Sequence, residues 1–203
     1  MDGNSSQLLA TRCRRWCAVV LVLTLGQLVL APLSPWWSNF AGKAFAARLV
    51  AYPVMMLALP LVRRLRYPWA GDALGWRASA FVMAPFLVDV TGNSLDLYDR
   101  VVWWDDLCHF LNWFLLMSGL GLLLDPRRLA PRLVRFLAIT GLGAMLAIVW
   151  ELGEWASFIR FGTELTTAYT DTLGDLCLGT CGAALAGWLI VRDSSDLSAA
   201  DAG

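Results

Sequence analysis

Charged residues are scarce in this 203-residue sequence, and lysine and histidine are almost missing from it. Asp, Glu, Lys and Arg make up 16% of the chain, against about a quarter in soluble globular domains. Apolar residues make up 58%, and the formal net charge is zero. The apolar composition excludes a disordered chain, and the zero net charge excludes a nucleic-acid-binding domain of the basic type.

Cysteine is present in the wrong number for a disulfide framework. The chain has five cysteines, and an odd count with three of them inside apolar stretches does not suit one. Cys177 and Cys181 lie one helical turn apart and could hold a soft metal, but small apolar packing residues are the favoured interpretation. The chain also has no serine or cysteine nucleophile motif and no HxxH or HxxxH pair, which disfavours covalent catalysis and a two-histidine zinc motif.

Long apolar stretches, in contrast, are abundant. A bilayer core about 30 Å thick needs about 20 apolar residues of helix. Windows of that length predict an all-α polytopic membrane helix bundle, with a single transmembrane domain over residues 1–192 and a disordered cytoplasmic tail over 193–203. Pro53, Pro60 and Pro85 predict kinks or shorter helices in the second and third spans. The six predicted spans cover residues 16–33, 44–62, 79–97, 105–124, 133–158 and 172–191.

Basic residues are concentrated on one side of the predicted spans. Positively charged loops stay in the cytoplasm, so both termini are predicted to be cytoplasmic in a multi-pass protein of the bacterial plasma (inner) membrane. We interpret the N-terminal segment as a retained span, because Pro32 directly follows the best small-residue cleavage site, at Ala31. The cytoplasmic set is Arg12, Arg14, Arg15, Arg63, Arg64, Arg66, Arg77, Arg127, Arg128, Arg132, Arg135 and Arg192, and the outer set is Lys43, Arg48, Arg100 and Arg160.

Acidic residues gather at the opposite, outer ends of the last three spans. Each of these spans carries two polar residues three or four positions apart, a spacing that places both on one helical face. Because successive spans alternate in direction, the three pairs are expected at one membrane level. Ionisable groups in a bilayer are costly, so we expect these side chains to converge in the bundle interior. The set is Asp105, His109, Glu151, Glu154, Asp171 and Asp175.

Something must offset the mutual repulsion of these carboxylates, and three arrangements could do so. A divalent metal such as Zn, Mn or Mg is one, because carboxylates with one imidazole are suitable ligands. Shared protons are a second. Counter-charges from the outer arginines are a third, with Arg48, Arg100 and Arg160 as the candidates.

A purely structural interpretation stands beside these. Asp105 and Asp106 could cap the fourth span and complement its dipole, and His109 could be a hydrogen-bond donor between helices. Asp89, alone in the third span, is either a further contributor to the acidic set or a partner for Arg48.

Two short segments carry a resemblance to known families. Glu151-Leu152-Gly153-Glu154-Trp155, followed by Asp171-Thr172 and Asp175-Leu176, resembles the YjdF-type bacterial inner-membrane proteins. Asp105, His109-Phe110 and the Glu151/Glu154 pair are more distantly similar to the VanZ-like pattern, from which the chain departs at Asp106, Glu154 and Gly179. The resemblance covers roughly residues 98–187. It implies that the acidic helices form one site, and it names no reaction.

Three functions are compatible with this pattern. The first is a membrane-embedded enzyme, with a metal or acid–base chemistry, whose outer site acts on lipid or envelope substrates. The second is a proton- or cation-coupled transporter, and the third is a non-catalytic scaffold held together by a polar network. The lipid bilayer is the predicted partner and nucleic acid is not. The substrate and oligomeric state are left open.

Residue roles in the enzyme hypothesis follow from side-chain chemistry. His109 is the expected proton carrier near neutral pH. The predicted catalytic residues are His109, Glu151, Glu154 and Asp175, and the predicted metal ligands are Asp105, His109, Glu151, Glu154, Asp171 and Asp175.

Overall fold

The computed structural model describes residues 3–33, 35–40, 43–66, 72–124, 131–157 and 159–200. Its six long helices are each long and apolar enough to cross a membrane, which confirms the predicted all-α six-span bundle. Shorter elements join them: η1 (Ala31–Leu33), η2 (Pro35–Phe40), α4 (Leu97–Arg100), η3 (Ile159–Phe161) and η4 (Thr163–Thr166). The long helices are α1 (Gly3–Leu30), α2 (Phe45–Arg66), α3 (Asp72–Ser94), α5 (Trp104–Leu124), α6 (Arg132–Ser157) and α7 (Ala168–Ala200).

Several helix boundaries differ from the predicted spans. Helices α1 and α3 begin at Gly3 and Asp72, well before the predicted starts at residues 16 and 79, because an apolar window detects only the part of a helix that suits hydrocarbon. Helix α7 runs to Ala200, whereas a disordered tail was expected from residue 193. Segment 193–200 contains no glycine or proline, so nothing in it breaks the helix. Residues 201–203 lie outside the described part.

The third span also ends earlier than predicted. Helix α3 stops at Ser94, and Asp96 takes a left-handed backbone conformation with φ of 61° before α4 begins. A residue in that conformation cannot continue a right-handed helix, so α3 ends three residues before the approximate span end at residue 97. The prolines do not shorten their helices: α2 continues through Pro53 and Pro60, and α3 through Pro85.

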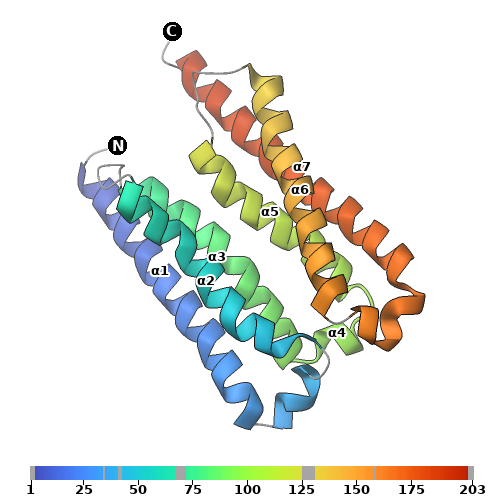
Figure 1. The fold of residues 1–203 in the computed structure, drawn as a ribbon. Helices are drawn as coiled ribbons and strands as arrows, with labels where there is room; N and C mark the ends of the chain where they lie inside the picture. Colours follow the sequence, from blue (N-terminus) through green and yellow to red (C-terminus); the bar gives the residue numbers. More distant parts are fainter. Residues whose placement is uncertain are drawn as a thin grey trace.

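The six long helices form two groups of three, and Figure 1 shows α1, α2 and α3 on one side and α5, α6 and α7 on the other. Within each group the helices pack closely, and α3 against α5 makes the main contact between the groups. Both ends of the chain lie at the same end of the bundle, while α4 lies at the opposite end (Figure 1). Most of the arginines that were predicted to be cytoplasmic lie toward the end of the bundle where the two termini lie (Figure 1). Arg127 and Arg128 lie outside the described residues.

The outer surface of the bundle is apolar, as a lipid-facing surface must be. Val50 and Val54 on α2 and Met145 and Val149 on α6 are each more than 60% exposed. Isolated apolar residues are common on any protein surface, but these recur one helical turn apart along whole helices. Such rows suit helices that are solvated by lipid chains rather than by water.

Glycines allow the helices that carry the polar residues to approach closely. A methyl group added at Gly182 of α7 would clash with the backbone of Phe110 on α5, and one at Gly119 of α5 would lie 2.6 Å from the Ala78 carbonyl of α3. Small residues at such contacts let membrane helices pack backbone to backbone. Gly182 of α7 is therefore used in the contact with α5, whereas Gly174 of the same helix has open space around it.

A candidate acidic and histidine site

Three carboxylates from three helices surround His109. The imidazole is buried, and its Nε2 atom lies 3.7 Å from Asp105 Oδ1 and 3.6 Å from Asp175 Oδ1. On the other side of the ring, Nδ1 lies 3.6 Å from Glu151 Oε1. These separations exceed hydrogen-bond length, so each carboxylate lies near the ring without bonding directly to it.

The helical spacing noted in the sequence accounts for this arrangement. Asp105 and His109 share a face of α5 because they are four residues apart. Glu151 lies near the end of α6 and Asp175 near the start of α7, so the antiparallel packing of these two helices brings both to the level of His109. All but Asp105 are almost fully buried, and the Asp105 side chain is 42% exposed. Solvent therefore reaches the cluster from the side of Asp105.

The residues form two overlapping sets that could hold a cation. In the first, Asp105, His109 and Asp175 offer ligand atoms that all lie within 4.8 Å of one another, and in the second His109, Glu151 and Glu154 do so. His109 belongs to both sets through different ring nitrogens. If one ring nitrogen binds an ion, the N–H group of the other ring nitrogen can donate a hydrogen bond to the carboxylate on the opposite side.

Asp171 is the predicted ligand that the structure leaves apart. It lies in the first turn of α7, is exposed, and belongs to neither set. Its neighbour Thr172 was not among the predicted residues, yet its side chain lies close enough to Glu151 to interact with that carboxylate. A threonine one turn before Asp175 on the same helix was a usable signal, because a hydroxyl there points into the same interior.

A second polar cluster occupies the N-terminal group of helices. Arg48 Nε donates to Asp89 Oδ2 at 3.0 Å and to the Tyr52 hydroxyl at 3.1 Å, and Tyr52 donates to the same Asp89 oxygen at 2.5 Å. The Tyr98 hydroxyl donates to the other Asp89 oxygen at 3.0 Å. Of the two roles considered for Asp89, the structure therefore favours that of partner for Arg48.

Both tyrosines were missed in the sequence. Tyr52 follows Arg48 by four residues, and a hydroxyl inside an apolar span needs a partner, so this pair was recognisable. Tyr98 lies on α4, between the spans, and no spacing rule connects it with Asp89. Burial raises the pKa of Tyr98 far above its ordinary value, so the phenol keeps its proton and acts as a donor.

The three outer arginines have different roles in the structure. Arg48 lies close enough to Glu154 to attract it electrostatically, so it can offset part of the repulsion in the acidic cluster. Arg100 instead pairs with Asp96 at 2.7 Å on the surface. The guanidinium of Arg160 lies over the rings of Trp155 and Phe161.

Lys43 pairs with an acidic residue of α4. Its Nζ atom lies 2.6 Å from Asp99 Oδ2, and this hydrogen bond lowers the pKa of the Asp99 carboxyl. Asp96 and Asp99 thus each have a basic partner. Neither belongs to the sets around His109.

A family model described as "Predicted membrane protein (DUF2238)" matches residues 15–195. The chain belongs to this family. The match includes every residue of both polar clusters, and it confirms the YjdF-like resemblance seen in the sequence. Among curated proteins and among solved structures, nothing matches the chain.

Family membership establishes that the protein is a membrane protein, but it does not identify a reaction. The DUF2238 protein is a multi-pass membrane protein, with the lipid bilayer as its surroundings. The family description names no reaction, so any chemical role has to be argued from the residues around His109.

Proposed function

We propose that this DUF2238 protein is a metal-dependent, membrane-embedded enzyme of the bacterial inner membrane. Its site faces the outer side and acts on a lipid or envelope substrate. The observation that carries the proposal is the placement of Asp105, Glu151 and Asp175, from three helices, at 3.6–3.7 Å from the nitrogens of the buried His109. The outward direction rests on the distribution of arginine along the chain.

The spacing around His109 suits an ion between the side chains. Two ligand atoms that are each about 2.1 Å from a metal can lie up to about 4.2 Å apart, and the distances from His109 Nε2 to Asp105 and to Asp175 fall within that limit. A divalent cation would also neutralise carboxylates that otherwise repel one another across a medium of low dielectric constant. One imidazole with several carboxylates suits Zn or Mn, and Mg to a lesser degree.

Of the two sets, we assign the ion to Asp105, His109 and Asp175. Asp105 is partly exposed, so an ion there keeps an open position for water or substrate, as catalytic metal sites do. Glu151 faces Nδ1. It would then accept a hydrogen bond from the Nδ1–H group and so orient the imidazole. Glu154, beside Glu151, remains as a general base or acid. Asp171, outside both sets, has no ligand role in this assignment.

Transport is less well supported by the packing around the site. Further along the same three helices, towards the basic end, the described core consists of Met117, Ile139, Ala183 and Ala186, all apolar and buried. A proton or cation pathway needs polar groups on both sides of the bilayer. If the cluster were only a structural scaffold, replacing its carboxylates with neutral amides should cause no loss of a bound metal or substrate.

Metal content tests the proposal directly. The protein purified in mild detergent is expected to hold about one equivalent of Zn or Mn, measured by inductively coupled plasma mass spectrometry. His109→Ala and Asp175→Asn should each lower the metal content at least tenfold, because each removes one of three protein ligands. Glu154→Gln should keep the metal while abolishing any hydrolytic activity on envelope lipids.

Asp106→Asn is the matched control, because Asp106 adjoins Asp105 on the same helical turn, is exposed, and belongs to neither set. It should bind metal like the wild type. Absence of metal after supplementation with Zn and Mn, in protein that remains folded, would reject the metal site. Loss of metal in Glu154→Gln but not in Asp105→Asn would move the ion to the Glu151 side of the ring.

Metal binding should also depend on pH in a defined direction. The ligands bind as neutral imidazole and ionised carboxylates, so protons compete with the metal. Lowering the pH from 7.5 to about 5 should therefore weaken metal binding, and returning to neutral pH with added metal should restore it. Equilibrium dialysis across this range measures the release. Constant occupancy from pH 7.5 to pH 5 would contradict the assignment.

A further inference from the structure

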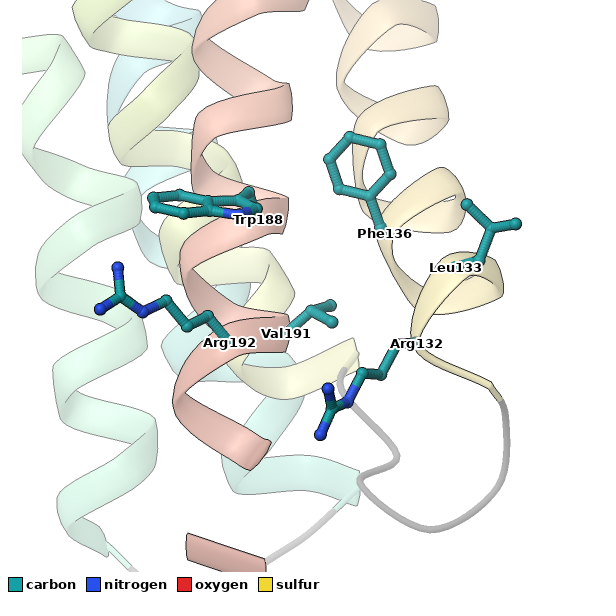
Figure 2. A pocket seen from close by; sticks show the side chains of 6 residues that line it. All are labelled: Arg132, Leu133, Phe136, Trp188, Val191 and Arg192. Atoms are coloured by element: carbon teal, nitrogen blue, oxygen red, sulfur yellow. The ribbon is translucent and has the colours of Figure 1, made fainter. Parts of the chain in front are cut away.

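A pocket opens between α6 and α7 at the end of the bundle where the termini lie. It has a volume of about 350 Å³, and Figure 2 shows its lining side chains, with an arginine near the end of each helix and an aromatic ring one turn further along each. The pocket is separated from the acidic site by the length of the two helices. Its lining residues are Arg132, Leu133, Phe136, Trp188, Val191 and Arg192.

The lining combines positive charge with apolar surface. Arg132 and Arg192 are exposed. In Figure 2, Arg132 extends toward the start of α6, whereas the Arg192 side chain turns back along α7 toward Trp188; Phe136 and Trp188 lie deeper along the helices. The Arg192 guanidinium lies 5.4 Å from the centre of the Trp188 ring, a cation–π contact that orients the charge. Among the side chains that the structure describes, none that lines this pocket is acidic.

We propose that this pocket binds the phosphate headgroup of an anionic phospholipid from the surrounding leaflet. Arg132 and Arg192 would attract the phosphate electrostatically, and a guanidinium group offers several donors in a planar arrangement that matches phosphate oxygens. The acyl chains would lie along Leu133, Phe136 and Trp188. The lipid is a ligand distinct from any substrate of the acidic site.

The depth of the pocket in the membrane supports a lipid rather than a soluble anion. Arg132 begins α6, and Arg192 is the last residue of the apolar span within α7, so both arginines lie at the level of the headgroups. Tryptophan is also enriched at that level. Basic pockets between membrane helices on the cytoplasmic side are typical sites for anionic headgroups, and the arginine distribution predicts that this end is cytoplasmic.

Native mass spectrometry of the full chain in detergent micelles tests the proposal. Phosphatidylglycerol and phosphatidylcholine with identical acyl chains are titrated separately, and the bound lipids are counted. We expect one phosphatidylglycerol to bind in preference to phosphatidylcholine. The variant Arg132→Gln/Arg192→Gln should bind it about 25-fold more weakly, because each basic residue contributes about a fivefold change in affinity for an anionic surface.

Arg64→Gln/Arg77→Gln is the matched control, because both residues are exposed arginines near the same end of the bundle, on α2 and α3. This variant has the same net charge as the pocket variant and should keep wild-type affinity. Equal loss in both variants, or equal binding of the two lipids, would overturn the proposal. Displacement of the bound lipid by millimolar inorganic phosphate would assign the pocket to a soluble anion instead. Both arginine pairs are exposed, and an unchanged thermal midpoint confirms that the variants are folded.

Discussion

Replacing Arg48 with methionine is expected to destabilise the protein by about 3–5 kcal/mol, the usual loss when one partner of a buried ion pair is removed. Arg48 and Asp89 are both buried, so the variant leaves a carboxylate in the bundle interior without its counter-charge. The hydroxyls of Tyr52 and Tyr98 still donate to it, which favours the lower part of that range. Thermal unfolding in detergent should show a midpoint lower by about 6–12 °C.

Two further variants separate the ion pair from the loss of side-chain volume. Arg48→Met/Asp89→Asn should recover much of the stability, because neither partner is then charged and the amide can still bond to the tyrosines. Arg100→Met removes the exposed partner of Asp96 and should change stability by about 1 kcal/mol or less. If Arg48→Met is no more harmful than Arg100→Met, the buried pair has no special role in stability.

Substituting alanine for Gly182 should loosen the contact between α5 and α7. The added methyl group would clash with the backbone of Phe110, and backbone can yield only if one helix moves. Overpacking of this kind typically destabilises by about 1–3 kcal/mol. Because α5 carries His109 and α7 carries Asp175, the same movement should lower metal occupancy without any ligand being removed.

Gly174→Ala is the control on the same helix. Open space surrounds Gly174, and alanine is intrinsically a better helix former than glycine, so this variant should be as stable as the wild type or slightly more stable. Thermal unfolding and metal content are measured on both variants. If Gly182→Ala matches Gly174→Ala in both measurements, the close approach of α5 and α7 is not needed for stability or for the site.

The sequence was sufficient for the membrane architecture because the apolar signal is local. Twenty apolar residues in a row identify a span without any knowledge of its neighbours, and all six were found. Helix ends were predicted less well, because Gly3–Trp16 and segment 193–200 are polar helix that a window for hydrocarbon ignores. The end of α3 depends on the left-handed backbone of Asp96, which composition does not reveal.

The site was predictable only in part, for a similar reason. Residues three or four apart share a helical face, so the pairing of Asp105 with His109 could be read directly from the sequence. Which helices face one another is a tertiary property. The separation of Asp171 from the cluster and the link from Tyr98 to Asp89 both depend on it.

The division of the two polar clusters between the halves of the chain has a consequence for biogenesis. Arg48 and Asp89 both lie in the first three helices, so their charges can neutralise each other while the second half is still being synthesised. The site around His109 is completed later, because Asp175 lies on α7, which follows α5 and α6 in the chain. Until α7 has inserted and packed against α5, His109 lacks one of the carboxylates that surround it. The Arg48–Asp89 pair can therefore form before the His109 site does.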